Sequence, residues 1–198
     1  MSNNLLYIFT VLDNLNISYI VVEGLHNKQY DNKFKQDLDL ILDCQENDIL
    51  PYLNNMKEFR NLEKNSFLDI KNNLRIDLYF NCLNVGYYHY LKFSGADFDK
   101  KRISSINYIV YQIIDPILKF SFYHERHKKR LIFYFSNRRN EDVKKELGVI
   151  FGSYISNFFI NKLQKSEFTF SRFFIKICKL RLLFINGNFV RMLKSRIL

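Results

Sequence analysis

The spacing of hydrophobic residues predicts alternating helices and strands in the first 80 residues. Apolar residues with helical spacing predict a helix over about 3–15. The β-branched and aromatic run at 17–22 predicts a buried strand, which Glu23 and Gly24 end in a turn. A polar loop at 25–36 leads into a second strand, and a helix of about ten residues follows it.

A hairpin is predicted next, after a segment at 58–64 that reads as extended. Its strands are 66–70 and 74–80, and the turn-forming pair Asn72-Asn73 joins them. Along the second of these strands apolar residues alternate with Arg75, Asp77 and Tyr79. Because side chains alternate between the faces of a strand, we expect Asp77 to lie on the polar face.

Two acids in the strand before that hairpin are separated by a single apolar residue. In a strand, Asp37 and Asp39 project from one face while Leu38, Leu40 and Leu42 anchor the other. Two adjacent carboxylates repel one another unless a cation lies between them. The pattern therefore predicts a site for a divalent metal ion on this strand.

The C-terminal part is predicted to be helical. Asp115 is expected to cap a helix with Pro116 at its first position, and further helices are expected from about 140, over 168–185 and over 188–197. Residues 83–112 read as strands or short connectors. The predicted fold class is α+β: a small mixed β-sheet flanked by helices at 1–114, followed by a basic helical domain at 115–198.

Charge divides the chain in the same way. Residues 1–115 carry 12 Lys and Arg against 15 Asp and Glu, whereas residues 116–198 carry 18 against 5. Such a basic half suits an anionic partner, although a basic helical surface that only keeps the protein in solution is the simpler alternative. The three cysteines are widely spaced and the N-terminus has no basic segment, so we expect a cytoplasmic protein without a disulfide framework.

The first 80 residues resemble the nucleotidyltransferase superfamily, which shares a minimal fold with polymerase-β-like enzymes. The matching residues are Gly24 at the end of an apolar strand, the loop at 26–36, the Asp37-Leu38-Asp39 motif and the later acid Asp77. More loosely, the layout is similar to nucleotidyltransferase-like proteins encoded among bacterial surface-polysaccharide genes. In one departure, Leu25 stands where the superfamily usually has Gly or Ser.

The resemblance implies a Mg²⁺-dependent enzyme that transfers a nucleotidyl or phosphoryl group from a nucleoside triphosphate to an acceptor hydroxyl. Asp37, Asp39 and Asp77 would be the catalytic metal ligands, and Gly24 would contact the nucleotide. Lys33 and Lys35 are close enough along the loop to contact its phosphates, and a loop that is merely solvated is the alternative for these two lysines. The acceptor is expected to be anionic: a glycan, a lipid-linked carrier or a nucleic acid. Because some members of the superfamily keep the fold without catalysis, the alternative is a noncatalytic module that binds nucleic acid or an anionic glycan carrier.

The basic C-terminal segment allows two interpretations. Residues 173–185 mix bulky apolar side chains with Lys176, Lys179 and Arg181. Such a helix most often packs its apolar stripe on its own domain. Peripheral docking to an anionic membrane surface is the other expectation.

Overall fold

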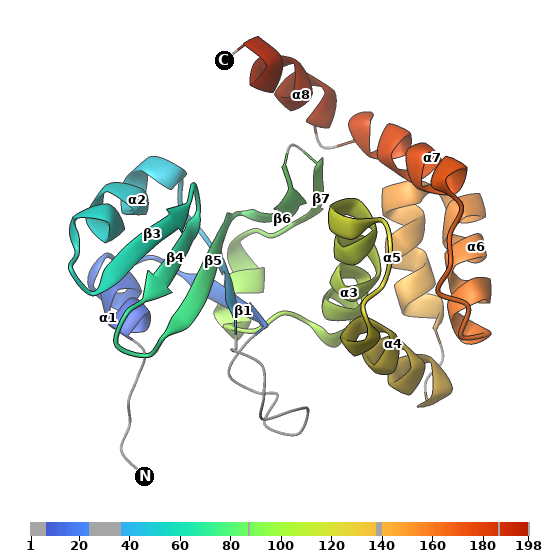
Figure 1. Ribbon diagram of the computed structural model, residues 1–198, viewed down its shortest axis with the longest axis horizontal. Helices are drawn as coiled ribbons and strands as arrows, with labels where there is room; N and C mark the ends of the chain where they lie inside the picture. Colours follow the sequence, from blue (N-terminus) through green and yellow to red (C-terminus); the bar gives the residue numbers. More distant parts are fainter. Residues whose placement is uncertain (1–6, 24–36, 87, 138–139, 186, 198) are drawn as a thin grey trace. The chain divides into compact units, whose positions relative to one another are not determined.

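The computed structural model describes residues 7–23, 37–86, 88–137, 140–185 and 187–197. The chain forms two compact units, the first comprising Met1–Cys82 and Lys92–Ile103 and the second Leu83–Leu91 and Ser104–Leu198. The first is built around a mixed sheet and the second around helices. The predicted α+β class, with a mixed sheet flanked by helices and then C-terminal helices, is confirmed (Figure 1).

The sheet unit has a five-stranded sheet with the strand order β1-β2-β5-β4-β3. Strands β2 and β5 are parallel, whereas the other neighbouring pairs are antiparallel. Its elements are α1 (Tyr7–Asn14), β1 (Tyr19–Glu23), β2 (Leu38–Leu42), α2 (Glu46–Asn55), β3 (Phe59–Glu63), β4 (Ser66–Asp69), β5 (Leu74–Phe80) and the 3₁₀ helix η1 (Gly95–Lys100).

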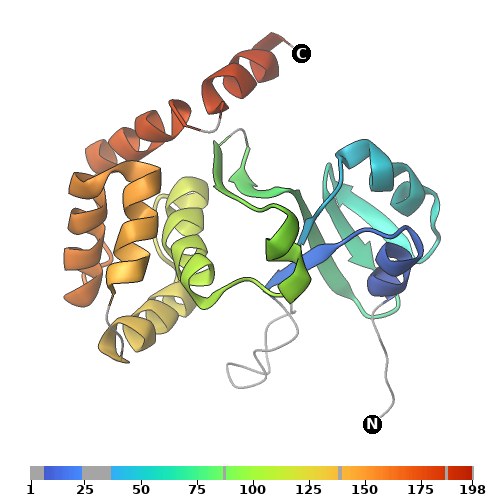
Figure 2. The same ribbon diagram turned by 180° about the vertical axis from the view of Figure 1, so that it is seen from behind.

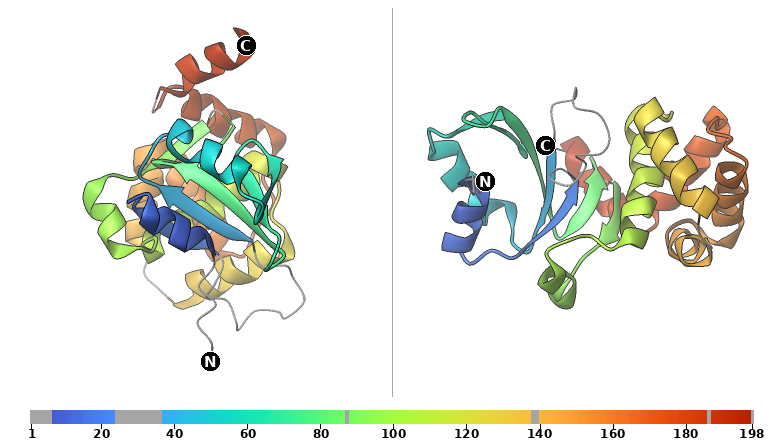
Figure 3. Two further views of the ribbon diagram at one scale, coloured as in Figure 1. Left: turned by 90° about the vertical axis from the view of Figure 1, so that its left-hand side faces the viewer. Right: turned by 90° about the horizontal axis from the view of Figure 1, so that it is seen from below.

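Helices α1 and α2 cover one face of this sheet (Figure 3). The core there joins Leu12 of α1 and Leu53 of α2 to Leu40 of β2 and Phe67 of β4, and each is at most 1% exposed. Burial of these side chains fixes which face of β2 turns inward, because a shift by one residue would bring the acids into the core. The pattern of hydrophobic residues therefore places Asp37 and Asp39 on the opposite face.

The hairpin between β4 and β5 forms as predicted. Asp69 accepts a hydrogen bond from the backbone N–H of Asn72 at 3.0 Å, which stabilises the turn. Asn73 takes up the left-handed conformation with φ of 48°, which Asn tolerates better than most residues. The turn sets the register in which Ser66 of β4 pairs with Asp77 of β5.

The helical unit places its helices beside a small two-stranded sheet (Figure 2). Helix α3 contacts α4, α5 and α7, and α5 packs along α6. Among the described residues, no helix is long and apolar enough to cross a membrane. The elements are β6 (Cys82–Val85), β7 (Tyr88–Lys92), α3 (Ser105–Phe120), α4 (Glu125–Asn137), α5 (Glu141–Phe151), α6 (Ser153–Gln164), α7 (Arg172–Leu183) and α8 (Asn188–Ile197).

The first helix of the second unit begins earlier than the sequence predicted. Ser104 caps α3 by accepting a hydrogen bond from the backbone N–H of Asn107 at 3.1 Å, so the prediction that Asp115 caps the helix is wrong. Asp115 and Pro116 lie inside α3, and the predicted domain boundary at 114/115 falls within this helix. The helix tolerates Pro116 because its apolar side chains are buried along most of its length.

Candidate functional site

The three predicted acids lie on one face of the sheet in the first unit. Strands β2 and β5 are parallel and pair Asp39 directly with Asp77. Asp37 lies two residues before Asp39 and so projects from the same face. Asp39 is 6% exposed, while Asp77 is partly exposed. The neighbouring residues Leu38 and Ile76 are buried on the opposite face, as expected from the alternation.

The edge of the sheet next to these acids is irregular. Strand β1 pairs Val21 with Leu40 but Glu23 with Asp39, so its register shifts between these positions. Such β-bulges increase the local twist and often occur beside functional sites. The irregularity brings the backbone of β1 level with Asp39 where the chain enters the predicted nucleotide-binding loop.

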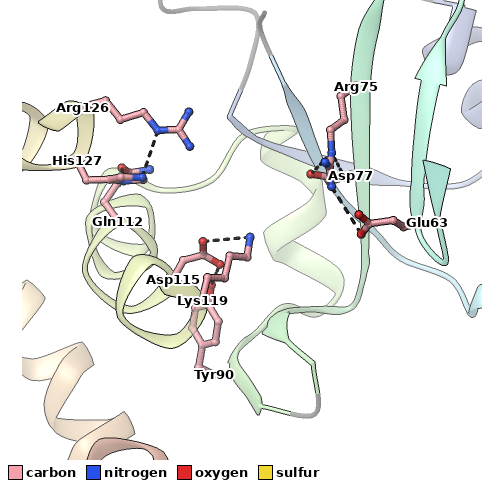
Figure 4. Close-up of polar contacts among 9 residues, drawn as sticks. All are labelled: Glu63, Arg75, Asp77, Tyr90, Gln112, Asp115, Lys119, Arg126 and His127. Atoms are coloured by element: carbon pink, nitrogen blue, oxygen red, sulfur yellow. Dashed lines mark hydrogen bonds and ion pairs between the residues drawn. The ribbon is translucent and has the colours of Figure 1, made fainter. Parts of the chain in front are cut away.

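Arg75 is an additional member of this site (Figure 4). Its Nε donates to both carboxylate oxygens of Asp77, at 2.9 and 3.2 Å, and its Nη2 lies 3.9 Å from Oε2 of Glu63. The hydroxyl group of Ser66 also donates a hydrogen bond to Asp77. Two donors on two strands thus fix the orientation of the Asp77 carboxylate.

The charges that act on Arg75 include that of Asp37. Burial disfavours the charged guanidinium, but the hydrogen bond and charge of Asp77, followed by the charges of Glu63 and Asp37, raise the pKa of Arg75. Arg75 therefore remains protonated and lies close to acids on β3 and β5 and to the acid just before β2. The repulsion among the carboxylates is partly offset by a cation that the chain itself supplies.

The donor set suits a hard divalent ion such as Mg²⁺, which prefers carboxylate oxygens. Within the described part of the chain, however, no three His, Cys, Asp or Glu side chains are grouped closely enough to hold a metal ion. The contacts of Asp77 with Arg75 and Ser66 give a physical reason, since Ser66 lies on β4 and therefore on the side of β5 away from β2. Asp37 and Asp39 are the residues that would hold the ion, and Asp77 would join them after it releases Arg75.

Three other predicted residues lie outside the described part of the chain. They are Gly24, Lys33 and Lys35, which are predicted to contact the nucleotide, and the divergent Leu25 lies there too. Of the predicted site residues, the structure describes Asp37, Asp39 and Asp77, and it pairs Asp39 with Asp77 on adjacent strands.

Comparison with known proteins adds no assignment. No protein-family model, curated protein or solved structure matches this chain.

Sequence reasoning did not find Ser66 and gave Arg75 no role. The period-two alternation that placed Asp77 on the polar face also places Arg75 there, so its position was available as a signal. Ser66 was accessible only through the hairpin register, which pairs it with Asp77 across the strands. A Ser or Thr opposite a candidate metal ligand in a predicted hairpin is the corresponding signal.

Proposed function

We propose that this protein transfers a nucleotidyl or phosphoryl group from a nucleoside triphosphate to an acceptor hydroxyl in a Mg²⁺-dependent reaction. The observation that carries the proposal is the register of two parallel strands, which pairs Asp39 with Asp77. Asp37 adds a third carboxylate to the same face. This arrangement of acids on two adjacent strands supports the resemblance to nucleotidyltransferases beyond the sequence motif itself.

Each residue of the site has its own role in the proposed reaction. When bound, Mg²⁺ would neutralise the charge that develops on the transferred phosphoryl group. Asp37 and Asp39 would hold the ion against the triphosphate. Asp77 would complete the ligand set and accept the proton of the acceptor hydroxyl. Arg75 and Ser66 would orient the Asp77 carboxylate before the substrates bind.

The acceptor in this proposal is anionic, because the residues after 115 carry most of the positive charge. A phosphate-bearing glycan or a lipid-linked glycan carrier fits this charge, and synthesis of a surface polysaccharide would require such an acceptor. A basic surface raises the local concentration of an anionic substrate and increases its association rate.

We also propose that helix α7 docks the protein on an anionic membrane surface. One face of α7 is buried in its own unit through Ile175, Cys178 and Leu182. A second apolar stripe is formed by Phe173, Leu180 and Phe184, which are 74%, 54% and 71% exposed. Their spacing of seven and four residues places them on one side of the helix.

Charge favours lipid as the partner of this stripe. Arg172, Lys176 and Arg181 are exposed on the same helix. A helix with an outward apolar stripe between basic side chains lies in the headgroup region of anionic membranes, where the long basic side chains reach the lipid phosphates. This position would bring a lipid-linked acceptor to the protein.

The alternative is a noncatalytic module that keeps the fold and binds an anionic glycan carrier or nucleic acid. The contact between Arg75 and Asp77 favours it, because a guanidinium already supplies positive charge to the acids. In this alternative Arg75 would act as a permanent counter-ion, and Asp37 and Asp39 would bind no metal.

Thermal stability in the presence of nucleotides distinguishes the two functions. A ligand that binds only the folded state raises the melting temperature. We expect at least one of the four nucleoside triphosphates to stabilise the protein with Mg²⁺ and not without it. Asp39→Asn should abolish this shift, whereas Asp43→Asn, which makes the same change just after β2, should retain it. Stabilisation that persists in Asp39→Asn would refute the proposed active site.

A further inference from the structure

Helix α3 of the second unit carries a polar stripe that runs from two buried side chains to an exposed lysine. Gln112, Asp115 and Lys119 follow one another at spacings of three and four residues, so they lie on one side of the helix. Gln112 is fully buried and Asp115 is 5% exposed. Asp115 pairs with Lys119 at 3.1 Å and accepts a hydrogen bond from the hydroxyl of Tyr90 at 3.3 Å (Figure 4).

Gln112 connects this stripe to helix α4. Its Oε1 lies 2.8 Å from Nδ1 of His127 and 3.3 Å from Nη1 of Arg130. On the other side of the imidazole, Nε of Arg126 donates to Nε2 of His127 at 3.3 Å. A continuous chain of hydrogen bonds thus runs from Arg126 through His127 and Gln112 to Arg130.

These contacts define the protonation of His127. Because Nε2 accepts from Arg126, the proton must be on Nδ1, which donates to Gln112. Burial, followed by the charges of Arg126, Arg130, His124 and Lys119, lowers the pKa of His127 to about 3. His127 is therefore neutral near pH 7, and it orients a guanidinium instead of adding to the positive charge.

Arg126 and Arg130 are one turn apart on α4, so both guanidinium groups extend from the same side of the helix. A guanidinium has five N–H donors in a planar fork, and holding it by one of them orients the others. Ordering the side chains in this way costs conformational entropy, and a basic surface that only keeps the protein in solution does not require such order. Two oriented guanidinium groups match the oxygens of a phosphate.

We propose that Arg126 and Arg130, positioned by His127 and Gln112, bind a phosphate group of a small ligand, either a phosphomonoester or a diphosphate. Lys119 adds a further positive charge close to His127. Phosphate binding by these arginines does not require that the acids of the sheet be catalytically active. Only its use to hold the acceptor of the transfer reaction rests on the proposed function.

Pyrophosphate is the probe for this site, and its binding to the full chain is measured by titration calorimetry in buffer stripped of divalent ions. The absence of metal removes any contribution from Asp37 and Asp39, so this experiment can succeed or fail independently of the proposed function. We expect saturable binding to one site. Replacement of either arginine by Gln should weaken binding at least about tenfold, since a charge-assisted hydrogen bond contributes roughly 1.5–3 kcal/mol.

Two matched variants separate an oriented site from diffuse attraction. Lys129→Gln removes one exposed positive charge from the same helix and should weaken binding less than about threefold. Arg130→Lys keeps the charge but loses the planar fork, so it should weaken binding nearly as much as Arg130→Gln. The proposal is overturned if the wild type shows no saturable binding, if Lys129→Gln loses as much affinity as the arginine variants, or if Arg130→Lys binds like the wild type.

Discussion

Asp39 and Asp77 occupy the same level of two adjacent parallel strands, and both project from the face opposite the core. Neither the hydrophobic core nor the hairpin requires acids at these positions. The two carboxylates repel one another at these positions, and Arg75 offsets part of this repulsion by binding Asp77.

Arg75→Gln should bind divalent ions more tightly than the wild type, by roughly threefold to tenfold, because it removes a cation that competes for Asp77. Calorimetric titration with Mg²⁺ measures the change. Arg60→Gln is the control, since Arg60 is exposed on β3 of the same sheet. Weaker metal binding in Arg75→Gln would show that Arg75 supports the site and does not compete for it.

Phe67→Ala should lower the free energy of unfolding by about 3–5 kcal/mol, because Phe67 is 1% exposed in the core beneath the acids and its removal leaves a cavity. Phe173→Ala removes the same side chain from a position that is 74% exposed and should change stability by less than about 0.5 kcal/mol. Urea unfolding monitored by circular dichroism measures both. Similar losses in the two variants would contradict the assignment of the core.

Stability should decrease as the pH falls because of His127. Its pKa is lowered from 6.5 to about 3 in the folded protein, so the unfolded chain binds the proton more strongly. The stabilisation is complete above about pH 6.5 and is lost progressively down to about pH 3, and the loss between pH 7.5 and pH 5 is about 2 kcal/mol. The groups that face the imidazole are Arg126, Arg130, His124 and Lys119.

Urea unfolding at several pH values tests this effect. His127→Gln should reduce the loss of stability between pH 7.5 and pH 5 by about 2 kcal/mol, because Gln does not titrate. His124→Gln is the matched control, since it makes the same replacement at an exposed histidine one turn away. An unchanged slope in His127→Gln would mean that His127 is not buried in its neutral form.

Sedimentation with lipid vesicles tests the membrane proposal. The wild type should bind phosphatidylglycerol-containing vesicles at low salt and not pure phosphatidylcholine. Substitution of Phe173, Leu180 and Phe184 by Ser should lower the partition coefficient at least about tenfold, because the apolar stripe no longer enters the headgroup region. A variant with Val149 and Tyr154 replaced by Ser, both also highly exposed, should bind like the wild type. Equal binding by the stripe variant and the wild type would rule out docking through α7.

The sequence was sufficient to predict that Asp39 and Asp77 lie on the sheet face opposite the core, because this placement depends on local patterns. Alternation in the strands around Asp39 and Asp77 separates apolar from polar faces, and the Asn72-Asn73 pair fixes the hairpin between β4 and β5. The orientation of Asp77 was beyond this reasoning. It depends on Ser66, which pairs with Asp77 only once the hairpin has formed.

The central part of the chain was harder to predict because tertiary packing outweighs local preference there. Residues 107–111 are rich in aromatic and β-branched side chains, which favour strands, yet they belong to α3. Burial of Ile109, Val110 and Ile113 stabilises the helix despite this preference and despite Pro116. The hydrogen bonds between Gln112 and α4 join residues 15 and 18 positions apart, a spacing that sequence periodicity does not reveal.

Binding of Mn²⁺, measured by electron paramagnetic resonance as loss of the free-ion signal, tests the central claim most directly. Mn²⁺ takes the same oxygen ligands as Mg²⁺. Asp43→Asn should bind the ion like the wild type, whereas Asp39→Asn should bind it at least about tenfold more weakly, because it loses a charged ligand. Equal Mn²⁺ affinity in the wild type and Asp39→Asn, or no binding by the wild type, would contradict a metal site on this face of the sheet.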